Sequence, residues 1–283
     1  MRKMSTVRKT TNIFVYVFLS VLALIWVLPI LWVILTSFRE ESGSFTPYFL
    51  PQGYTLKNYI NLLTDNSTFD FPRWFMNTLF VSVVTCIIST FFVLSVSYTM
   101  SRLRFRLRKP LMNIALILGM FPGFMSMIAV YYVLKSFGIE QSLLALILVY
   151  SAGTGLGFYV AKGFFDTVPR ALDEAAMIDG ASRGTIFWKI TLPMSKPIII
   201  YTLLTSFTAP WIDYIFASVI MGDNYENYTV ALGLFKMLEK EFIHNYYTQF
   251  AAGAVIVSIP IAILFISTQK FYVGGVTGGS VKG

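Results

Sequence analysis

Residues 169–193, PRALDEAAMIDGASRGTIFWKITLP, form a charged stretch between two long apolar runs. A helix can begin at Pro169, because the missing N–H of proline costs nothing at the first helical position. Gly180 suits the residue just after that helix, which often needs a positive φ. Ser182 suits the N-cap of a second short helix, which ends at Pro193. The pattern therefore predicts a helix, a tight turn and a second helix lying across a membrane surface.

The first of these helices has two unlike faces on a 3.6-residue period. One face carries apolar or small side chains and one acid: Leu172, Ala175, Ala176 and Asp179. The other face carries mostly charged side chains: Arg170, Asp173, Glu174 and Met177. The two alanines make the first face nearly smooth, so we expect that another helix or a groove can approach it closely.

The composition indicates a membrane protein. Of 283 residues, 56% are hydrophobic and 13% are charged, whereas a soluble domain has about 25% charged residues. The single cysteine, Cys86, excludes an intrachain disulfide and a Cys-rich metal site. The apolar run near the N-terminus is longer than the core of a cleaved signal peptide, so we interpret it as an uncleaved first span.

Six apolar runs are long enough to cross a membrane, which takes about 20 helical residues. Helices are expected because an open chain in lipid must satisfy its backbone groups internally. The fold class is therefore an all-α membrane protein with six transmembrane helices. The predicted spans are Ile13–Ser37, Trp74–Ser101, Leu111–Leu134, Ser142–Ala161, Pro197–Gly222 and Asn245–Gln269. Four prolines, at 29, 122, 210 and 260, lie inside these runs and are expected to kink them.

The basic residues are distributed unequally between the two sides. With six spans, sixteen Lys and Arg residues fall on the side of both termini and residues 169–193, and six fall on the other. The positive-inside rule then places both termini in the cytoplasm, with the spans in a cytoplasmic membrane. The basic loop 102–109 could indicate nucleic-acid binding, but its position between two spans favours contact with anionic lipid. We expect no nucleic-acid partner.

The chain divides into three parts by this reading. Residues 1–73 hold the cytoplasmic N-terminus, the first span and a long outer loop. Residues 74–272 hold five spans and form the core, with residues 169–193 as a cytoplasmic loop. Residues 273–283 are a glycine-rich cytoplasmic tail.

The spacing of residues 169–193 resembles the EAA loop of ABC importer permeases, and we use that name for the segment from here on. The positions that carry the resemblance are Glu174, Ala175, Ala176, Gly180, Ile190, Leu192 and Pro193. The resemblance implies that this loop docks in a groove of a separate ATPase and couples its motion to the spans. An ordinary interfacial helix-turn-helix, with Glu174 paired to Arg170, is the competing reading.

Further features resemble the carbohydrate-type permeases of bacterial binding-protein-dependent ABC importers. They are the Asn77-Thr78-Leu79 entry to the second span, Trp211-x-Asp213, and the terminal Gly-Gly-Ser-Val-Lys-Gly, which is similar to the MalG-type subunit of maltose and maltodextrin importers. Ile212 departs from the usual Asn. The resemblance implies a type I ABC importer permease that moves maltose, maltodextrin or another oligosaccharide.

The resemblance also implies a set of partners. They are a second permease subunit forming a heterodimer, two ATP-binding subunits, an extracytoplasmic sugar-binding protein and the lipid bilayer. The chain itself has one histidine, His244, and no catalytic set, metal cluster or nucleotide motif that we recognise. We therefore expect a transport subunit that is not an enzyme and has no cofactor of its own, with ATP and Mg bound by the partner ATPase. The tail is expected to reach the ATPase dimer.

Asp213 is the ionisable residue that lies well inside a predicted span, so it should face the bundle interior. Carbohydrates are bound by aromatic faces and by carboxylates and amides. The hypothesis for the substrate path is therefore Asp213 with Trp211, Tyr214, Asn77 and Thr78. An equally open reading is that Asp213 fixes helix packing near the outer end of its span.

The outer loop 222–247 is aromatic and acidic around a helical stretch at Thr229–Phe242. An exposed aromatic loop without a lipid-facing role suits a protein contact. The residues proposed to contact the binding protein are Tyr228, Leu232, Gly233 and Phe235.

Two other functions stay open at this point. An ion-coupled secondary transporter would need ionisable residues at the midplane and usually repeated halves, of which only Asp213 is present. An ABC permease for a solute other than a sugar is also compatible with an EAA loop.

Overall fold

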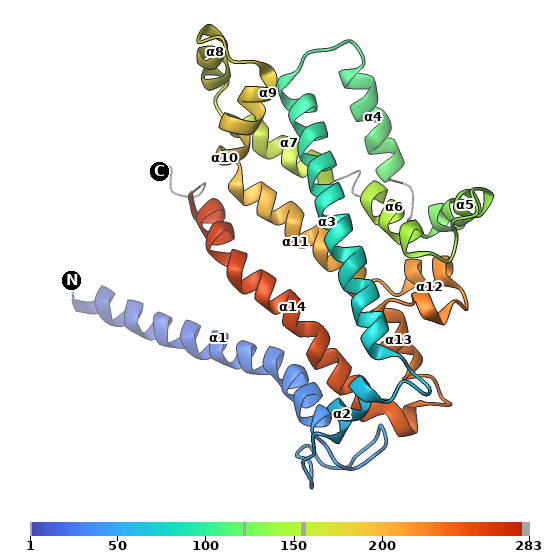
Figure 1. Cartoon of the computed structure of the whole chain (residues 1–283). Coiled ribbons are helices and arrows are strands. Elements are labelled where there is room, and N and C mark those ends of the chain that lie inside the picture. Colours follow the sequence, from blue (N-terminus) through green and yellow to red (C-terminus); the bar gives the residue numbers. More distant parts are fainter. Residues whose placement is uncertain (1, 121–122, 154–156, 279–283) are drawn as a thin grey trace. The chain divides into compact units, whose positions relative to one another are not determined.

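The computed structural model describes residues 2–120, 123–153 and 157–278. Within these ranges the regular elements are helices, and the β pairing recorded is one isolated bridge between Arg39 and Tyr54 (Figure 1). This confirms the all-α class.

The helices follow one another closely along the chain. Their bounds are α1 Arg2–Ser37, α2 Lys57–Thr64, α3 Phe71–Arg102, α4 Arg108–Gly119, α5 Gly123–Ser136, α6 Leu143–Gly153, α7 Gly157–Thr167, α8 Arg170–Ile178, α9 Arg183–Ile186, α10 Leu192–Met194, α11 Lys196–Ile212, α12 Ile215–Met221, α13 Val230–Lys236 and α14 Ile243–Gly278. A π-helical turn, Phe187–Thr191, joins α9 to α10, and a 3₁₀ turn, Tyr225–Asn227, precedes α13.

The chain forms two compact units. The first contains residues 1–70 and 236–256, and the second contains residues 71–235 and 257–283. The predicted boundary at residue 73 lies close to the first division, but residues 236–256 group with the N-terminal part. The final tail residues, 279–283, lie outside the described residues.

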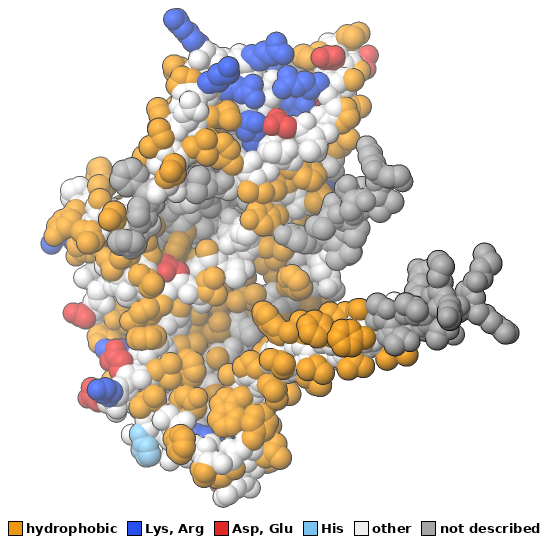
Figure 2. All heavy atoms as spheres, turned by 180° about the vertical axis from the view of Figure 1, so that it is seen from behind, with side chains coloured by type: hydrophobic (Ala, Val, Ile, Leu, Met, Phe, Trp, Pro, Cys, Tyr) orange, Lys and Arg blue, Asp and Glu red, His pale blue; other side chains and the backbone are white. Residues whose placement is uncertain are grey.

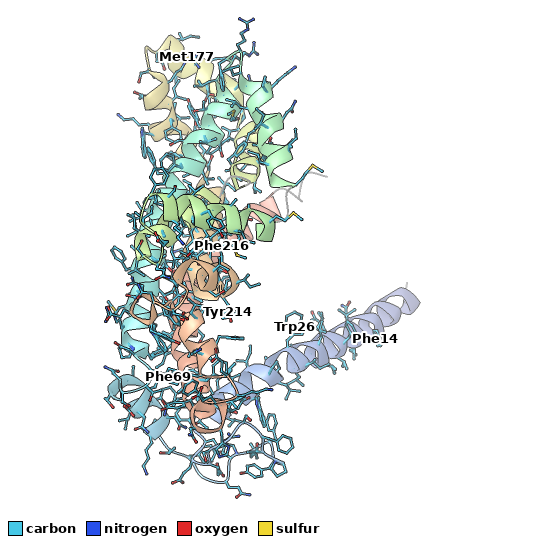
Figure 3. All side chains as sticks on the ribbon, turned by 90° about the vertical axis from the view of Figure 1, so that its right-hand side faces the viewer. Phe14, Trp26, Phe69, Met177, Tyr214 and Phe216 are labelled. Carbon is cyan, nitrogen blue, oxygen red and sulfur yellow. The ribbon has the colours of Figure 1, made fainter. Side chains whose placement is uncertain are left out.

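The first unit is built around aromatic contacts and a long apolar helix. Phe69 packs edge-on against Phe242 and Tyr246, with ring centroids 5.0 and 4.7 Å apart. The apolar run of α1 is exposed along its length, and Figure 3 shows Phe14 and Trp26 projecting from it. Such a helix needs lipid or a partner helix to cover it. Within the long loop after α1, the short helix α2 covers its apolar side by burying Leu62.

The second unit is organised along α3. Its core cluster joins α3 to α7, to the π-helical turn and to α11. The members at its centre are Val93, Tyr98, Phe158, Phe165 and Phe187. Small polar residues also lie buried along α3, including Ser82, Thr85 and Ser89, which is typical of close packing between membrane helices. Helix α3 is therefore the element against which the other helices of this unit pack.

The described residues support three to five spans. Three helices are each long and apolar enough to cross a membrane alone: Asn12–Ser37, Phe71–Arg102 and Ile243–Phe271. Two more spans are reached if each of two bent pairs counts as one, namely α6 with α7 and residues 183–194 with α11. The predicted third span, Leu111–Leu134, is instead divided between α4 and α5, each too short to cross alone. Its Pro122 lies outside the described residues.

The predicted fifth span, Pro197–Gly222, is not one continuous helix. Helix α11 ends at Ile212, Asp213 is extended with φ −83° and ψ 111°, and α12 begins at Ile215. Pro210 lies just before the break and cannot donate a backbone hydrogen bond, which weakens the last turn of α11. By contrast, Pro29 and Pro260 lie inside the continuous helices α1 and α14.

Helix α13 is shorter than the predicted stretch Thr229–Phe242 and ends at Lys236. It packs tightly against α3: a Cβ added to Gly233 would overlap the Trp74 ring. Only a residue without a side chain lets the backbone approach the indole this closely.

We therefore expect Gly233→Ala to displace α13 from α3. Overpacking of this kind typically costs about 1–3 kcal/mol, so the melting temperature in detergent should fall. The matched control is Gly163→Ala in α7, where an added Cβ meets no atom within 4 Å. Equal melting temperatures for the two variants would contradict the packing described here.

Candidate functional site

The EAA loop begins as predicted. Helix α8 starts directly after Pro169, and Gly180 has a φ of +83°. The Ser182 hydroxyl then accepts a hydrogen bond from the Thr185 N–H at 3.2 Å, capping α9. The predicted helix, glycine turn and capped second helix are confirmed.

The end of the loop differs from the prediction. The helix does not stop at Pro193 but continues through the π-helical turn to Met194, and Ser195 is its C-cap. Proline is accommodated at the first turn of a helical segment, where no N–H is needed, and the π-helical turn places Pro193 at such a position. The segment from Arg183 to Met194 meets α11 at a bend of 84°.

The two faces of α8 have different environments. On the charged face, Asp173 is 9% exposed and turns toward the body of the unit. The alanine face is open: Ala175 is exposed, Ala176 is half-buried and Leu172 is 38% exposed. Glu174 is exposed and, among the described residues, makes no ion pair with Arg170. The loop therefore presents a smooth face and a free carboxylate to a partner.

Arg102, at the end of α3, fastens the loop to the unit. Its Nε lies 3.4 Å from Asp173 Oδ2, and both side chains are largely buried. Its Nη2 donates to the carbonyls of Phe165 and Val168, each at 2.8 Å. One guanidinium thus joins the ends of α3 and α7 to α8.

A second contact supports the same junction. The Tyr98 hydroxyl donates to the Arg183 carbonyl at 3.2 Å, and the Tyr98 ring lies 4.8 Å from the Phe187 ring. Arg170 also donates to the Ser101 carbonyl at 3.3 Å. The end of α3 is therefore bonded to both halves of the EAA loop.

Basic side chains gather at this end of the second unit (Figure 2). They come from the loop before α4, from the first turn of α4 and from the EAA loop, and the exposed ones are Arg104, Arg106, Lys109, Arg170, Arg183 and Lys189. Figure 3 shows Met177 of α8 at the same end. This end suits anionic headgroups or an acidic partner surface.

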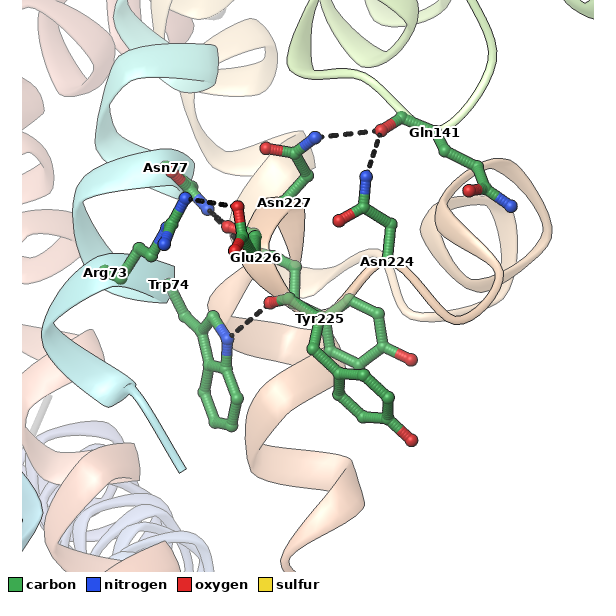
Figure 4. Close-up of polar contacts among 9 residues, drawn as sticks. Arg73, Trp74, Asn77, Gln141, Asn224, Tyr225, Glu226 and Asn227 are labelled. Carbon is green, nitrogen blue, oxygen red and sulfur yellow. Dashed lines mark hydrogen bonds and ion pairs between the residues drawn. The ribbon is translucent and has the colours of Figure 1, made fainter. Parts of the chain in front are cut away.

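The opposite end of α3 holds residues 222–230 in place (Figure 4). Arg73 pairs with Glu226 at 2.9 Å, and the Trp74 indole N–H donates to the Tyr225 carbonyl at 3.0 Å. Asn224 and Asn227 both donate to the Gln141 carbonyl, at 3.0 and 2.9 Å. The loops predicted to lie outside the membrane thus meet one another at one end of α3.

Asn77 and Thr78 belong to this outer junction. The Asn77 amide donates to the carbonyls of Glu226 and Tyr228, and Thr78 accepts the Val230 N–H at 2.8 Å. Among the described residues neither is bonded to Asp213, and a cavity wall shared with Asp213 stays a prediction. Their polar side chains form hydrogen bonds with backbone groups of residues 226–230, which would otherwise be buried without partners.

The residues proposed to contact a binding protein are mostly buried. Tyr228 is 7% exposed and donates to the Gly222 carbonyl, Leu232 is buried, and Gly233 lies against Trp74. Phe235 alone among the four is open, and its ring stacks at 4.0 Å on Tyr214. The other three are buried because α13 packs its apolar face against α3.

Asp213 lies at the break between α11 and α12. Its Oδ1 accepts the Phe216 N–H at 3.0 Å, and its Oδ2 accepts the Tyr150 hydroxyl at 2.7 Å. Figure 3 shows Tyr214 and Phe216 next to this break. The carboxylate thus bonds the backbone of α12 and links it to α6, and both readings of Asp213 stay open.

Trp211, the remaining residue of that hypothesis, is buried between aromatic rings. It lies edge-on to Phe75, with centroids 5.2 Å apart, and near Phe207. It packs α11 against α3 rather than lining an open path.

Sequence reasoning missed several residues that organise the two ends. Arg102, Trp74, Gln141 and Tyr150 make their key contacts with residues more than 60 positions away. No local spacing signals such contacts, although an arginine at the last position of a span is a hint of an interfacial role.

Comparison with a solved structure identifies the fold. The fold is similar to a chain of a bacterial ABC transporter involved in the import of the acidic polysaccharide alginate, with a TM-score of 0.79, 22% identity, and 93% of this chain and 97% of that chain covered. The two chains therefore share one fold.

The sequence comparisons then give the family. Residues 93–274 match the model of the binding-protein-dependent transport system inner membrane component, and the chain belongs to this family. It is 36% identical to the galactooligosaccharides transport system permease protein GanQ of Bacillus subtilis, over 96% of this chain and 95% of that protein. It is 32% identical to the maltodextrin transport system permease protein MdxG of the same organism, over 99% of both.

These findings confirm the resemblance to carbohydrate-type importer permeases drawn from the EAA loop. They also confirm a multi-pass protein of the cytoplasmic membrane, in agreement with its several apolar helices. The chain is thus the membrane component of a multi-subunit importer.

The Arg102 junction yields a prediction. Removing one partner of a buried ion pair leaves the other charge uncompensated and costs about 3–5 kcal/mol. Arg102→Gln should therefore lower the melting temperature in detergent by several degrees and loosen the EAA loop toward protease. Arg106→Gln, in the same basic segment but exposed, should behave like the unchanged protein. A protected loop in Arg102→Gln would refute the fastening role.

Proposed function

We propose that this chain is one of the two membrane subunits of an ABC importer for an oligosaccharide. The observation that carries the proposal is the exposed, partner-free face of the EAA loop in a chain whose relatives are named for sugars. A galactooligosaccharide or a maltodextrin is the substrate class that these names support.

The proposed topology has six spans and both termini in the cytoplasm. Spans that run in alternating directions would put the loops that meet near Arg102 on one side of the membrane. The loops that meet near Gln141 would then lie on the other side. The basic end of the second unit is the cytoplasmic one, in line with the positive-inside rule. In this topology, α4 and α5 together make the third span along the chain, which brings the number of spans to six.

The EAA loop is the proposed contact with a separate ATPase. Ala175 and Ala176 give the smooth face, Glu174 gives an unpaired carboxylate for a basic partner, and Gly180 sets the turn. Ile190, Leu192 and Pro193 form the return of the loop toward α11. The ATPase binds ATP and Mg, and this chain has no catalytic role in hydrolysis.

The proposed assembly contains a second permease, two ATP-binding subunits and an extracytoplasmic sugar-binding protein. The open faces of Tyr214, Tyr225 and Phe235 form the aromatic surface for the binding protein. Aromatic side chains of this kind are enriched at the centres of protein interfaces.

The substrate is tested with the assembled complex in proteoliposomes. Galactooligosaccharides or maltodextrins, loaded on the cognate binding protein, should raise ATP hydrolysis above the level with empty binding protein. Binding protein mixed with methionine or with citrate in place of a sugar serves as the non-sugar control. If no sugar stimulates hydrolysis, the proposed substrate class is wrong.

Gly180 tests the coupling role without changing charge. Space around it is open, but an L-residue at φ +83° carries a strain of roughly 1–2 kcal/mol. Gly180→Ala should therefore weaken co-purification of the ATPase and reduce transport several-fold. Gly184→Ala in α9 is the matched control, because Gly184 has no positive φ. Full coupling in Gly180→Ala would exclude the proposed docking geometry.

A further inference from the structure

An apolar groove of about 500 Å³ lies in the second unit between α3, α4, α6 and α7. Its floor is buried, with Val93 4% and Phe158 7% exposed, and its rim is open, with Phe92 56% and Leu148 46% exposed. The side chains that line it are apolar apart from Ser151. An open groove of this kind in a membrane protein is covered by an acyl chain or by another helix.

Helix α4 forms one wall of this groove and is held to the unit by few contacts. None of its residues is buried. Met112 and Ala115 lie against the core cluster, and the Tyr159 hydroxyl donates a hydrogen bond to the Met112 carbonyl. Protein interiors leave few voids larger than a water molecule, so the space between α4 and α3 calls for an occupant that completes the packing.

The groove has the dimensions of one acyl chain in one leaflet. Along α3 it extends from Ile88 to Val96, which is about 12 Å at 1.5 Å per residue. One leaflet contributes about 15 Å of hydrocarbon, half of a layer about 30 Å thick. A volume of about 500 Å³ also falls within the range of roughly 300–1,000 Å³ for pockets that bind a small molecule.

Both walls of the groove lead to the same basic segment. Helix α3 ends at Arg102, about 9 Å beyond Val96. Lys109, in the first turn of α4, lies about 9 Å beyond Ala115 in the same way. The polar layer of a bilayer follows directly on its hydrocarbon. Residues 102–109 are therefore placed at headgroup level when an acyl chain occupies the groove.

Residues 102–109, RLRFRLRK, alternate basic and apolar side chains and contain no acid. Phe105 and Leu107 are exposed between the cations, which suits insertion at a membrane surface. Three cations of the segment are exposed and make no ion pair among the described residues: Arg104, Arg106 and Lys109. Asp166, an acid of the neighbouring α7, is already paired with Lys162 at 2.6 Å. The three cations thus have no counter-charge within the described chain.

We propose that the groove binds one anionic phospholipid. One acyl chain lies between α3 and α4, and Arg104, Arg106 and Lys109 hold the phosphate. A helix of another subunit would fill the groove but would leave the three cations without a counter-charge, whereas an anionic lipid meets both requirements. The bound lipid ties α4 to α3. This inference goes beyond the proposed function, because it does not depend on the solute that the importer moves.

The direct test is photolabelling of the assembled complex in nanodiscs of phosphatidylglycerol and phosphatidylcholine. Phosphatidylglycerol with a diazirine in its acyl chain should label the peptides that contain Phe92 and Ala115, as read by mass spectrometry. Phosphatidylcholine with the same diazirine should label them several-fold less, because each basic residue near the membrane surface favours anionic lipid about fivefold. Equal labelling by the two lipids would overturn the site.

Charge removal tests the headgroup contact. Arg104→Gln with Arg106→Gln should reduce the preference for phosphatidylglycerol by roughly tenfold or more, since about fivefold is lost with each arginine. The matched control is Lys57→Gln with Lys135→Gln, which removes two exposed charges predicted to lie on the other side of the membrane. The control should keep the preference. Equal preferences in the two double variants would show that these arginines do not hold the headgroup.

Filling the groove tests the acyl contact. Ala115→Phe should abolish labelling of the Phe92 peptide, and added phosphatidylglycerol should no longer raise the melting temperature in detergent. Leu116→Phe is the matched control, because Leu116 is exposed on the same helix and does not line the groove. If Ala115→Phe does not assemble, Ala152→Leu fills the same groove from α6. Unchanged labelling in a groove-filling variant that assembles contradicts the proposal.

A last measurement identifies the occupant without adding a labelled lipid. Phe92 is replaced by p-benzoylphenylalanine, and the complex is illuminated in a membrane that contains both phospholipids. Attachment of a phosphatidylglycerol mass to this chain is the expected result. Covalent capture of the second permease at this position would show that a protein helix covers the groove, and the lipid site would be rejected.

Discussion

The structure around the EAA loop depends on the contacts of one buried guanidinium group, that of Arg102. It lies where α3 leaves the apolar layer, and it bonds the end of α7 and the acid of α8 at once. A buried arginine needs several partners to offset its loss of water, so these segments are held in one arrangement. The EAA loop and the end of α3 are therefore joined directly, by side-chain contacts of a single residue.

The start of α3 uses mainly neutral groups for the same purpose, beside the exposed Arg73–Glu226 pair. Trp74, Asn77 and Thr78 follow one another on α3 and satisfy backbone groups of residues 225–230. The chain thus has a rigid helix with a charged junction at one end and an amide and indole junction at the other. Rigid elements with two anchored ends suit the rigid-body motions by which transporters alternate their access.

Between these junctions the chain is interrupted in the predicted fifth span. Helix α11 breaks at Asp213, next to Tyr150, and irregular backbone in a membrane is tolerated where it is buried in protein or lines a cavity. Helix α11 joins the EAA loop on one side to this break on the other.

The sequence by itself determined the all-α class, the first, second and last of the predicted spans and the local geometry of the EAA loop, since these depend on composition, run length and local backbone preferences. Pro169, Gly180 and Ser182 set the loop's geometry through positive φ and capping, which need no distant partner. The tertiary structure decided which polar residues meet. Asn77 and Thr78 were expected near Asp213 but bond the outer loop, and Arg102 finds Asp173 across the unit. The reason is physical: a buried polar group pairs with whatever group folding brings within about 3 Å, and sequence spacing does not carry that distance.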